Sequence, residues 1–545
     1  MSADFPRSLN EACGVFACVS NSQPELESSL PFDVATCLCN GLIGLQHRGQ
    51  ESAGIVTTRG DTSDSFVHER GTGLVAKVFT EESLRQFKGS VQGIGHTRYF
   101  TFGSKYAFNC IQPYVVYSVH GLLAVAHNGE LVNSALLRKQ LLQRIGLSTD
   151  TDSELLAQLL ATAGHIQDSP RPDWPAAILD MMAKISTAYS LAILTVDAVY
   201  GVRHPWGNRP LCLGAIRVPV MESQVRLFRG GGETQTGLVD RAWVISSESC
   251  AFHNVGAELI RDVDPGEIIE ITRHGGIKSL GCYRPSNARL SFCIFEYVYF
   301  SRADSIMEKR LIDGKIKRGQ QVYRVRYRCG QQLGREAPLG QADTSTCIVS
   351  TVPESATPAA LGYADQVNIP YTEVLSKSRY EARTFIQPTE QLRKQGVSRK
   401  FAPLSDNYTG KRIVLIDDSI VRGNTMRPIV DLLKRTGAKE VHIRIASPPL
   451  RHPCMMGINI PTKDELIANK LHFPKDLKPG QNLSDFAAYL NADSVAYLSL
   501  DGLKIAVEEG LSRDRTPEDH GYCTACLSGN YPVDIEDIAS SVNGF

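Results

Sequence analysis

The sequence predicts two domains of different class, an α+β domain followed by an α/β domain. With 545 residues, the chain is too long for a single hydrophobic core. Its first half is rich in alternating apolar strands and glycine turns, as in residues 120–131 and 189–203. Its second half alternates strands with helices, which is typical of a parallel sheet whose ligands bind at the carboxyl ends of the strands.

The strand-dense half begins with the stretch NEACGVFACVS, residues 10–20, whose apolar residues repeat with a period of two. A helix is expected after the segment TDSE, residues 151–154, which has the sequence of a capping box before an apolar run. Glycine-rich turns in residues 262–281 end this half. We therefore expect the domain boundary near residues 280–290.

In the second half, residues 345–355 predict a strand and a loop, residues 412–438 a strand, a loop and a helix, and residues 441–449 the next strand. The helix has its apolar residues at i, i+3, i+4 and i+7, namely Met426, Ile429, Val430 and Leu433. Residues 305–321 are highly charged, and we interpret them as a surface insertion.

Composition and charge exclude several classes of protein. Lys plus Arg and Asp plus Glu number 58 each, so no net charge favours nucleic acid or a membrane surface. The sequence contains no run of eighteen apolar residues, the length needed to span a bilayer. The first twelve residues lack the apolar core of a secretory signal. The 14 cysteines are therefore expected as thiols or metal ligands in the cytoplasm.

Residues 413–425, IVLIDDSIVRGNT, carry the clearest chemical signal. Four apolar residues predict a buried strand, and Asp417 and Asp418 stand at its carboxyl end. The following loop leads to a helix amino terminus, which offers free N–H groups and a positive dipole end to a phosphate. The carboxylates can hold ribose hydroxyls and a Mg²⁺ ion. A simple helix cap is the alternative for a bare Asp-Asp pair, but the full pattern favours the phosphate site.

This segment resembles the signature of type I phosphoribosyltransferases, which bind phosphoribosyl pyrophosphate. The resemblance implies that the second domain has the parallel sheet of that family. It also implies a phosphoribosyl-pyrophosphate site made of Asp417, Asp418, Ser419, Arg422, Gly423, Asn424 and Thr425.

Four segments of the first half resemble class II, N-terminal-nucleophile glutamine amidotransferases. They are GLQHRGQESAG (44–54), GHTRY (95–99), HNGE (127–130) and TDSE (151–154). The resemblance implies an αββα sandwich in which Cys13 attacks the glutamine side-chain amide. Asn128 and the N–H of Gly129 would form the oxyanion hole. The residues expected to bind glutamine are Arg98, Thr101 and Asp152.

In N-terminal-nucleophile enzymes the free α-amine of the nucleophile can serve as its general base. That chemistry needs a cysteine with no residue before it. We therefore expect residues 1–12 to be a pro-segment that is removed between Ala12 and Cys13 by self-processing.

Together, the two halves resemble the amidophosphoribosyltransferase family over nearly the whole chain. Further similar segments are 293–302, 350–364, 379–388 and 451–466. In that family, ammonia from glutamine displaces pyrophosphate from phosphoribosyl pyrophosphate to give 5-phosphoribosylamine, the first step of purine synthesis. The resemblance implies a Mg²⁺ contact from Ser355, a catalytic-loop position for Lys400, purine nucleotide inhibitors and a homo-oligomer, either a tetramer or a dimer. Phe100 and Phe102 depart from the family pattern, which leaves the shape of the glutamine pocket open.

Cys523 and Cys526 form a C-x₂-C pair, and two thiolates do not fill a tetrahedral or cluster site. One group of the family carries a [4Fe-4S] cluster, and its four cysteine positions match Cys293, Cys454, Cys523 and Cys526. A zinc site with the same thiolates and a terminal pair without metal are the alternatives. Two nearby cysteines do not match the motif and are expected to be core or surface thiols, Cys250 and Cys282.

The expected layout is a pro-segment at 1–12, a glutamine amidotransferase domain at 13–285 and a phosphoribosyltransferase domain at 286–545 with a cluster-binding extension. Two alternatives keep only one half of this function. Glucosamine-phosphate synthase or asparagine synthetase would not need the Asp417–Asp418 loop. A transcription regulator that binds phosphoribosyl pyrophosphate would not need the glutaminase residues and would carry a basic DNA-binding face. Glutamine-dependent release of pyrophosphate separates all three.

Overall fold

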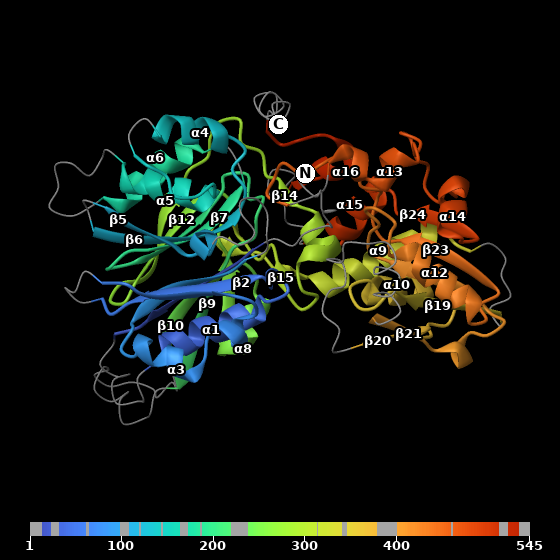
Figure 1. The fold of residues 1–545 in the computed structure, drawn as a ribbon, viewed down its shortest axis with the longest axis horizontal. Helices are drawn as coiled ribbons and strands as arrows, with labels where there is room; N and C mark the ends of the chain where they lie inside the picture. The colour runs from blue at the N-terminus through green and yellow to red at the C-terminus, as the bar shows by residue number, and fades with distance from the viewer. Residues whose placement is uncertain are drawn as a thin grey trace.

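The structure is a computed structural model, and its ribbon shows the two halves of the chain side by side (Figure 1). Strands and helices of the first half, coloured blue to green, form one body, and those of the second half, coloured yellow to red, form the other. The structure describes residues 13–22, 32–60, 65–98, 108–118, 121–142, 145–163, 173–185, 188–219, 238–312, 314–339, 346–378, 400–458, 462–511 and 521–533.

In the described part of the first half, the strands form two antiparallel sheets. The first sheet has the order β11-β9-β10-β1-β4-β2-β3 and the second the order β13-β12-β8-β7-β6-β5. The strands of the first sheet are β1 (Gly14–Ser20), β2 (Ser52–Thr58), β3 (Val67–Thr72), β4 (Gln92–Arg98), β9 (Cys212–Pro219), β10 (Leu238–Ser246) and β11 (Ala257–Asp262). Those of the second are β5 (Tyr114–Ser118), β6 (Gly121–Gly129), β7 (Tyr189–Leu194), β8 (Val199–Arg203), β12 (Glu267–Thr272) and β13 (Gly276–Cys282).

Successive residues of a strand point to opposite faces of its sheet, and in these strands the residues on both faces are apolar. One face of each sheet can therefore pack on the other sheet, and the opposite face packs under helices. Val15 and Val19 of β1 share a core with Ala124 of β6, between the sheets. Phe16 and Cys18, which point the other way, pack under helices on the outer face. Helices α1 (Val34–Gly44) and α8 (Cys250–Val255) contribute to that outer core, and α5 (Asp152–Ala161) and α6 (Trp174–Lys184) cover the second sheet. The predicted αββα sandwich is confirmed.

Helix α5 begins where the sequence predicts, but the prediction of a capping box at its start is wrong. The side chain of Thr151, the N-cap residue, makes no capping hydrogen bond within the described residues. The carboxylate of Glu154 instead accepts hydrogen bonds of 2.6 Å from the N–H groups of Ser148 and Thr149. A preceding loop therefore occupies the acceptor that the capping box would use.

In the described residues of the second half, four parallel strands form a sheet in the order β19-β22-β23-β24. The strands are β19 (Cys347–Thr351), β22 (Arg412–Asp417), β23 (Glu440–Ile445) and β24 (Ser494–Tyr497). Helices α9 (Val322–Glu336), α10 (Thr357–Val367) and α15 (Leu500–Glu508) pack on one face, and α12 (Met426–Arg435) and α14 (Ser484–Leu490) on the other. This is the predicted α/β domain with a parallel sheet.

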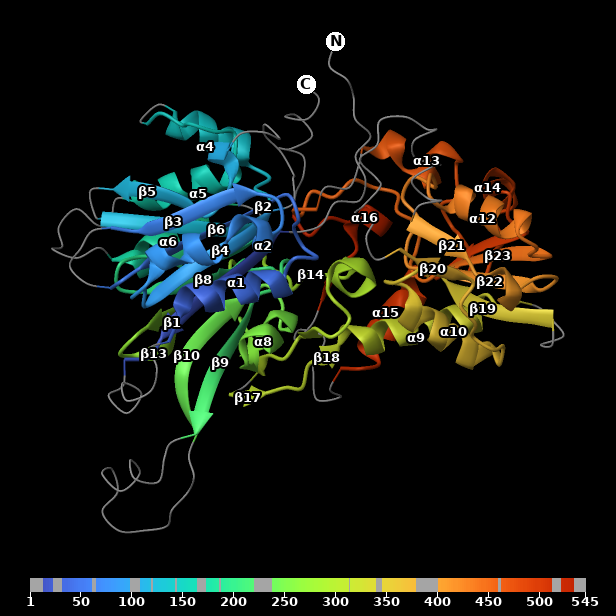
Figure 2. The same ribbon diagram turned by 60° about the horizontal axis from the view of Figure 1, so that its bottom comes forward.

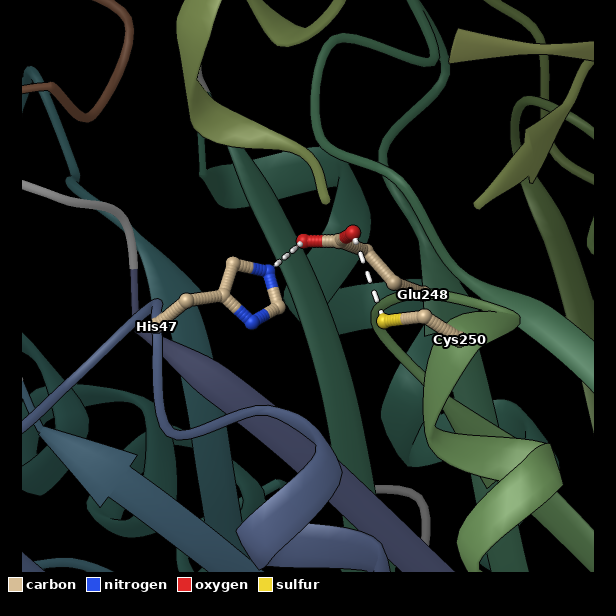
Figure 3. A group of neighbouring side chains, drawn as sticks. All are labelled: His47, Glu248 and Cys250. Carbon is tan, nitrogen blue, oxygen red and sulfur yellow. Dashed lines mark hydrogen bonds and ion pairs between the residues drawn. The ribbon is translucent and has the colours of Figure 1, made fainter. Parts of the chain in front are cut away.

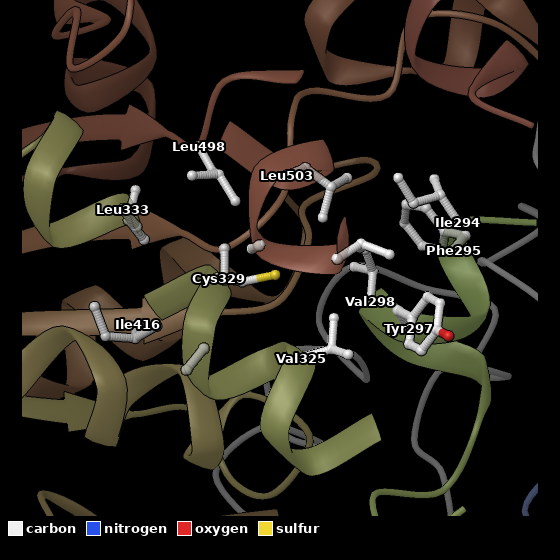
Figure 4. Close-up of a cluster of buried hydrophobic side chains, with 14 of the residues drawn as sticks. Ile294, Phe295, Tyr297, Val298, Val325, Cys329, Leu333, Ile416, Leu498 and Leu503 are labelled. Atoms are coloured by element: carbon white, nitrogen blue, oxygen red, sulfur yellow. The ribbon is translucent and has the colours of Figure 1, made fainter. Parts of the chain in front are cut away.

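Both faces of this sheet are buried, which explains the unbroken apolar run in β22. Val414 and Ile416 face the core of α9, α10 and α15, part of which Figure 4 shows, whereas Ile413 and Leu415 face the core of α12. The predicted periodicity of the helix is also confirmed, because its buried residues are Met426, Ile429, Val430 and Leu433.

The segments that join the halves come from distant parts of the chain. Strand β14 (Phe292–Cys293) pairs in parallel with β25 (Tyr522–Cys523), and α16 (Ala525–Ser528) follows β25. Both ribbon views place β14 and α16 between the two bodies (Figures 1 and 2). A short π-helix, Glu296–Phe300, follows β14. The carboxyl-terminal segment is therefore part of the junction between the two halves.

The prediction that residues 305–321 form a surface insertion holds for the exposed strand β17 (Lys315–Ile316) but is wrong for Glu308 and Arg310. The segment also contains β15 (Ile306–Met307), β16 (Leu311–Ile312) and β18 (Gln320–Gln321). Glu308 and Arg310 are buried. The hydroxyls of Tyr297 and Tyr522 donate to the carboxylate of Glu308, and Arg310 pairs with Asp264 at 3.0 Å. Glu308 and Arg310 therefore form buried contacts with both halves.

The remaining helices and strands are short. They are α2 (Val75–Val78), α3 (Glu81–Leu84), α4 (Ser134–Leu141), α13 (Ile467–Lys470), β20 (Leu375–Lys377), β21 (Phe401–Pro403) and the 3₁₀ turns Arg85–Phe87, Phe108–Cys110, Ser405–Asn407 and Lys463–Glu465. None of the helices in the described ranges is both long and apolar enough to be a membrane-spanning segment.

Candidate active sites

Cys13 lies directly before β1, at the end of the sheet where Gly14 pairs with Thr97 of β4. Its side chain is buried. Arg98 is the last residue of the adjacent strand β4, so sheet pairing places it beside Cys13. Residues 1–12 and Thr101, for which the sequence predicts a pro-segment and a glutamine contact, lie outside the described residues.

Asn128 and Gly129 end β6 in the facing sheet. Both polar atoms of the Asn128 side-chain amide are buried and have no hydrogen-bond partner among the described residues. A Cβ atom on Gly129 would lie 1.8 Å from the carbonyl oxygen of Ala188, so only glycine fits there. A buried, unpaired amide is costly unless a ligand completes it, and this one fits an oxyanion hole.

Asp152 lies at the start of α5, where its Oδ2 accepts a hydrogen bond of 2.7 Å from the N–H of Leu131. Burial raises the pKa of this carboxyl to about 6, against the lowering effects of the Leu131 N–H and of Arg138. Arg98 donates from Nη1 to the carbonyl of Cys110 at 2.9 Å. An acidic and a basic group thus accompany the thiol, as binding of an amino acid requires.

Arg48 is a site residue that sequence reasoning missed, although it belongs to the segment 44–54. Its guanidinium donates to the carbonyl of Cys13 at 3.1 Å and to both oxygens of Glu296, at 3.0 and 2.9 Å. Burial opposes the charge of Arg48, but Glu296 and Glu248 outweigh that effect and raise its pKa. This buried contact connects the nucleophile position to the π-helix after β14.

Glu248 is the centre of a buried polar group that Figure 3 shows with the side chains of His47 and Cys250 directed toward it. The Nε2–H of His47 donates to the carboxylate of Glu248 at 2.8 Å, and Arg48 and Ser305 also donate to it. These partners occupy both oxygens of Glu248, and Arg48 would repel a cation. The group is therefore an ion-pair network, and Cys250 is the buried core thiol expected from the sequence.

The carboxyl end of β22 carries Asp417 and Asp418. Ser355, from the loop after β19, donates its hydroxyl to Asp418 Oδ2, and Ser419 donates to Asp418 Oδ1 at 2.7 Å. Burial raises the pKa of both carboxyls, and the charge of Asp418 raises that of Asp417 further. Two buried carboxylates this close together favour a divalent cation between or beside them.

The loop from β22 to α12 contains the other predicted residues. Gly423 has a φ of 74°, Asn424 is exposed, and Thr425 directly precedes α12. Lys400 lies close enough to lower the pKa of Asp417. Arg422, in contrast, bonds Glu465 at 2.9 and 2.6 Å. The structure thus places Lys400 near Asp417 and the loop residues between the carboxylates and α12, and it directs Arg422 to Glu465.

Arg326 of α9 connects this site to the junction, and the sequence pattern gives no sign of it. With Ser355, Asp418 and Val298 it lines a small cavity. Its guanidinium donates to the carbonyl oxygens of Tyr297 at 2.8 Å and Ser301 at 2.7 Å, at the π-helix that carries Glu296. A buried chain of contacts therefore runs from the phosphoribosyl half to Arg48.

The four cysteines predicted to bind metal meet at the junction of the halves. Cys293 and Cys523 are paired residues of β14 and β25. Burial raises the pKa of Cys454 to about 12 and of Cys523 to about 11, and in both cases neighbouring thiols of the set raise it further. The pKa of Cys526 rises for the same two reasons, burial first. The structure thus brings all four thiols to one site.

Two family models match the chain. A glutamine amidotransferase domain matches residues 107–228, and a phosphoribosyl transferase domain matches residues 333–447. The amidophosphoribosyltransferase of Rattus norvegicus is 51% identical over 97% of this chain and 98% of its own length. The chain belongs to the amidophosphoribosyltransferase family.

More distant members agree with this placement. The amidophosphoribosyltransferase of Synechococcus elongatus is 39% identical over 98% of this chain and 93% of its own. The solved structure of glutamine phosphoribosylpyrophosphate amidotransferase from B. subtilis, complexed with ADP and GMP, has a TM-score of 0.74 at 35% identity and covers 96% of this chain and 98% of its own.

Membership of the amidophosphoribosyltransferase family defines the reaction. The protein is a glutamine-dependent phosphoribosyltransferase that catalyses the first step of purine synthesis. The rival functions considered for the sequence, a sugar or adenylating synthase and a transcription regulator, do not agree with relatives that match over nearly the full chain. The family is metal-dependent in its phosphoribosyl half.

Proposed function

We propose that Cys13 is the nucleophile of glutamine hydrolysis in this enzyme. Its thiolate attacks the side-chain amide carbon of glutamine, and the α-amine of a processed Cys13 accepts the thiol proton. The Asn128 amide and the N–H of Gly129 stabilise the oxyanion. The α-ammonium then returns its proton to the amide nitrogen, the C–N bond breaks, and ammonia leaves a γ-glutamyl thioester on Cys13. Water hydrolyses this thioester to glutamate and restores the thiol.

The observation that carries this proposal is the buried Asn128 amide, which has no hydrogen-bond partner among the described residues. It lies at the same end of the sandwich as Cys13, because the carbonyl of His127 bonds His96, the residue that pairs with Val15.

The proposal includes the substrate contacts and the maturation step. Arg98 pairs with the α-carboxylate of glutamine, Asp152 with its α-ammonium, and Thr101 contributes to the pocket. The α-amine can act as a base only when residues 1–12 have been removed. Cleavage between Ala12 and Cys13 is therefore part of the same proposal.

In the phosphoribosyl half, we propose that the loop from Asp417 to Thr425 binds phosphoribosyl pyrophosphate with Lys400. The residues proposed to contact the substrate are Asp417, Asp418, Ser419, Arg422, Gly423, Asn424, Thr425 and Lys400. Ser355, Asp417 and Asp418 would hold a Mg²⁺ ion, which neutralises the pyrophosphate. The raised pKa values of the paired carboxyls support this, because a divalent cation removes their mutual repulsion.

We also propose that Cys293, Cys454, Cys523 and Cys526 hold a [4Fe-4S] cluster with a structural role. The four thiols act electrostatically on one another, which supports a shared metal centre. Their match to the cysteine positions of the cluster-bearing members of the family favours iron and sulfide over zinc. The N–H of Met456 donates to Cys454 Sγ at 3.3 Å, a bond that suits a thiolate ligand.

Regulation, assembly and domain layout complete the proposal. A structural relative was solved with ADP and GMP, which supports purine nucleotides as inhibitors of this chain. We propose a homo-oligomer, a tetramer or a dimer, in the cytoplasm, where its 14 free cysteines suit a reducing environment. The loop between Cys282 and Phe292 supports a boundary between a domain at 13–285 and one at 286–545.

The test of the glutaminase assignment is Cys13→Ala with Cys18→Ala as the matched control, because Cys18 is a buried thiol of β1, the strand that Cys13 directly precedes. The Cys13 variant should lose glutamine-dependent synthesis and keep synthesis from free ammonia. Intact mass of the wild-type enzyme should correspond to a chain that starts at Cys13. A fully active enzyme that still carries Met1 or Ser2 contradicts the proposed maturation.

A further inference from the structure

Arg209 is a buried arginine for which the reaction of this family gives no role. It lies in the loop between β8 and β9, and its side chain is 0% exposed. Its carbonyl oxygen accepts hydrogen bonds from Arg203 Nε at 2.9 Å and Ser190 Oγ at 3.2 Å, which fix the backbone. None of its three guanidinium nitrogens has a hydrogen-bond partner among the described residues.

The nearest carboxylate does not satisfy this guanidinium. Nη1 of Arg209 is 3.5 Å from Oε1 of Glu296, beyond a good hydrogen bond. Arg48 already donates to both oxygens of Glu296, and Ser301 donates to Oε2 at 2.7 Å. Apart from this ion pair, the five N–H donors of a fixed, planar group are buried without a hydrogen-bond acceptor among the described residues. Proteins rarely leave such an arrangement uncompensated.

The loop that carries Arg209 adjoins the four-cysteine site, because the N–H of Cys293 donates to the carbonyl oxygen of Asn208 at 3.2 Å. The electrostatic partner that acts most strongly on Arg209 is the thiol of Cys293, followed by Glu296 and Cys454. The charge of Arg209 acts in turn on Cys523. Asn208, the preceding residue, donates its side-chain amide to the carbonyl of Ser291 at 2.9 Å, close to β14. The loop thus directs a cation toward the sulfurs.

We propose that Arg209 is a positioning residue of the cluster, whose N–H groups donate to its sulfur atoms and whose charge counters the four thiolates. This inference rests on the cluster under Proposed function. Hydrogen bonds to sulfur and net charge are the protein's main means of setting the reduction potential of such a cluster. Arg209 therefore raises that potential and slows oxidative loss of the cluster.

The experiment compares the anaerobically purified wild type with Arg209→Met and Arg209→Lys. Arg261→Met is the matched control, because Arg261 is a buried arginine whose guanidinium is paired with both oxygens of Glu267 at 2.7 Å. Its electrostatic partners are Glu267, Asp264 and Cys282, and not the four cysteines of the proposed cluster. Iron and sulfide per chain, the reduction potential and the rate of bleaching in air are measured for each. In Arg209→Met the potential should be more negative and bleaching on the order of tenfold faster, as for one lost charge-assisted hydrogen bond.

Arg209→Lys keeps the charge and should recover most of the potential, whereas Arg261→Met should match the wild type in both measurements. An Arg209→Met protein with wild-type potential and bleaching rate overturns the proposal while the cluster stands. A wild type without iron overturns the cluster and this inference together.

A second measurement uses the wild type itself, so that poor folding of Arg209→Met does not decide the matter. With isotope-labelled arginine, electron–nuclear resonance of the reduced cluster should show coupling to guanidinium nitrogen and its protons. This coupling should weaken or vanish in Arg209→Lys. Absence of the coupling in the wild type overturns the proposal.

Discussion

At the scale of single residues, Gly457 shows how closely the two halves approach each other. It belongs to the loop that carries Cys454, and it packs on the end of β6. A Cβ atom there would lie 2.9 Å from both the nitrogen of Glu130 and Cα of Gly129. Gly129 is the proposed oxyanion donor. The missing side chain of Gly457 therefore leaves the room that Gly129 needs to keep its position in the other half.

Gly457→Ala should therefore lower glutamine-dependent kcat/KM on the order of 10- to 100-fold, because a displaced Gly129 N–H no longer donates a hydrogen bond to the oxyanion. Synthesis from free ammonia should change little. Gly256→Ala is the control for backbone strain, since its φ of 67° is also positive but its Cβ would meet nothing within 4 Å. Steady-state kinetics with both nitrogen donors decide, and equal losses in the two reactions would contradict this account.

Asp152 predicts a pH dependence with a definite sign. Its pKa is raised from 3.8 to about 6, so the folded protein binds this proton more tightly than the unfolded chain does. The contribution to the free energy of unfolding consequently falls as pH rises from about 4 to about 6. Glutamine-dependent activity should instead increase over this pH range, because only the ionised carboxylate of Asp152 attracts the α-ammonium of glutamine.

Glutamine-dependent kcat/KM should thus fall about tenfold per pH unit below about pH 6. The ammonia-dependent rate, corrected for the concentration of free NH₃, serves as the control. Asp152→Asn should raise the KM for glutamine and abolish this acidic limb of the profile. If the fall of kcat/KM at acidic pH persists in Asp152→Asn, the group that titrates is not Asp152, and this prediction is wrong.

At the scale of elements, β22 and the loop before α12 form the phosphoribosyl site in one short segment. The strand is buried on both faces, so its carboxyl end is rigid, and Asp417 and Asp418 are held there with raised pKa values. Arg326 then connects Asp418 to the π-helix that pairs with Arg48. The position of one strand end therefore affects contacts in the other half.

Asp417→Asn and Asp418→Asn should each abolish synthesis from glutamine and from ammonia, since both reactions need the phosphoribosyl site. The variants should stay folded, and without Mg²⁺ the melting temperature should not fall, because a repulsive buried charge is removed. Asp406→Asn, an exposed carboxylate with an ordinary surface environment, is the control. Turnover with ammonia at the wild-type rate in either variant would exclude the carboxylate pair from catalysis.

At the scale of the whole molecule, the junction is made of segments that are far apart in sequence. Strand β14, strand β25 and the loop around Cys454 meet there, and residues 305–321 add buried charges. The four cysteines lie within this junction, so a cluster would tie the carboxyl-terminal segment to both halves. Its contribution should be to stability, with no redox step in the reaction.

Cys454→Ser should cost roughly 4 kcal/mol or more of stability, the size expected when a metal site is lost. Assembly should suffer before the catalytic constants of the surviving enzyme do. Cys282→Ser, at an exposed cysteine, should leave the melting temperature unchanged. Calorimetry with iron analysis checks this, and a Cys454→Ser enzyme of wild-type stability that lacks iron would refute a structural role.

The sequence by itself determined the features that depend on neighbours along the chain. The period of two in β1, the buried face of α12 and the acidic pair after an apolar strand all follow from local geometry. They predicted a strand-dense first half, a parallel sheet in the second half and the phosphate site, whereas the glutamine site and the αββα sandwich followed from the resemblance to a known family. The predicted capping box of α5 was wrong, because the carboxylate of Glu154 accepts from Ser148 in the preceding loop and not from the N-cap residue.

Only the tertiary structure decided which distant residues meet. Arg48 and Glu296 are 248 positions apart, and their pairing depends on how the two halves dock. Residues 305–321 have a charged sequence typical of a surface, yet Glu308 and Arg310 are buried because both halves supply their partners. Arg209 and Gly457 carry no periodic signal at all. Contacts of this kind follow from shape and burial, which no short stretch of sequence contains.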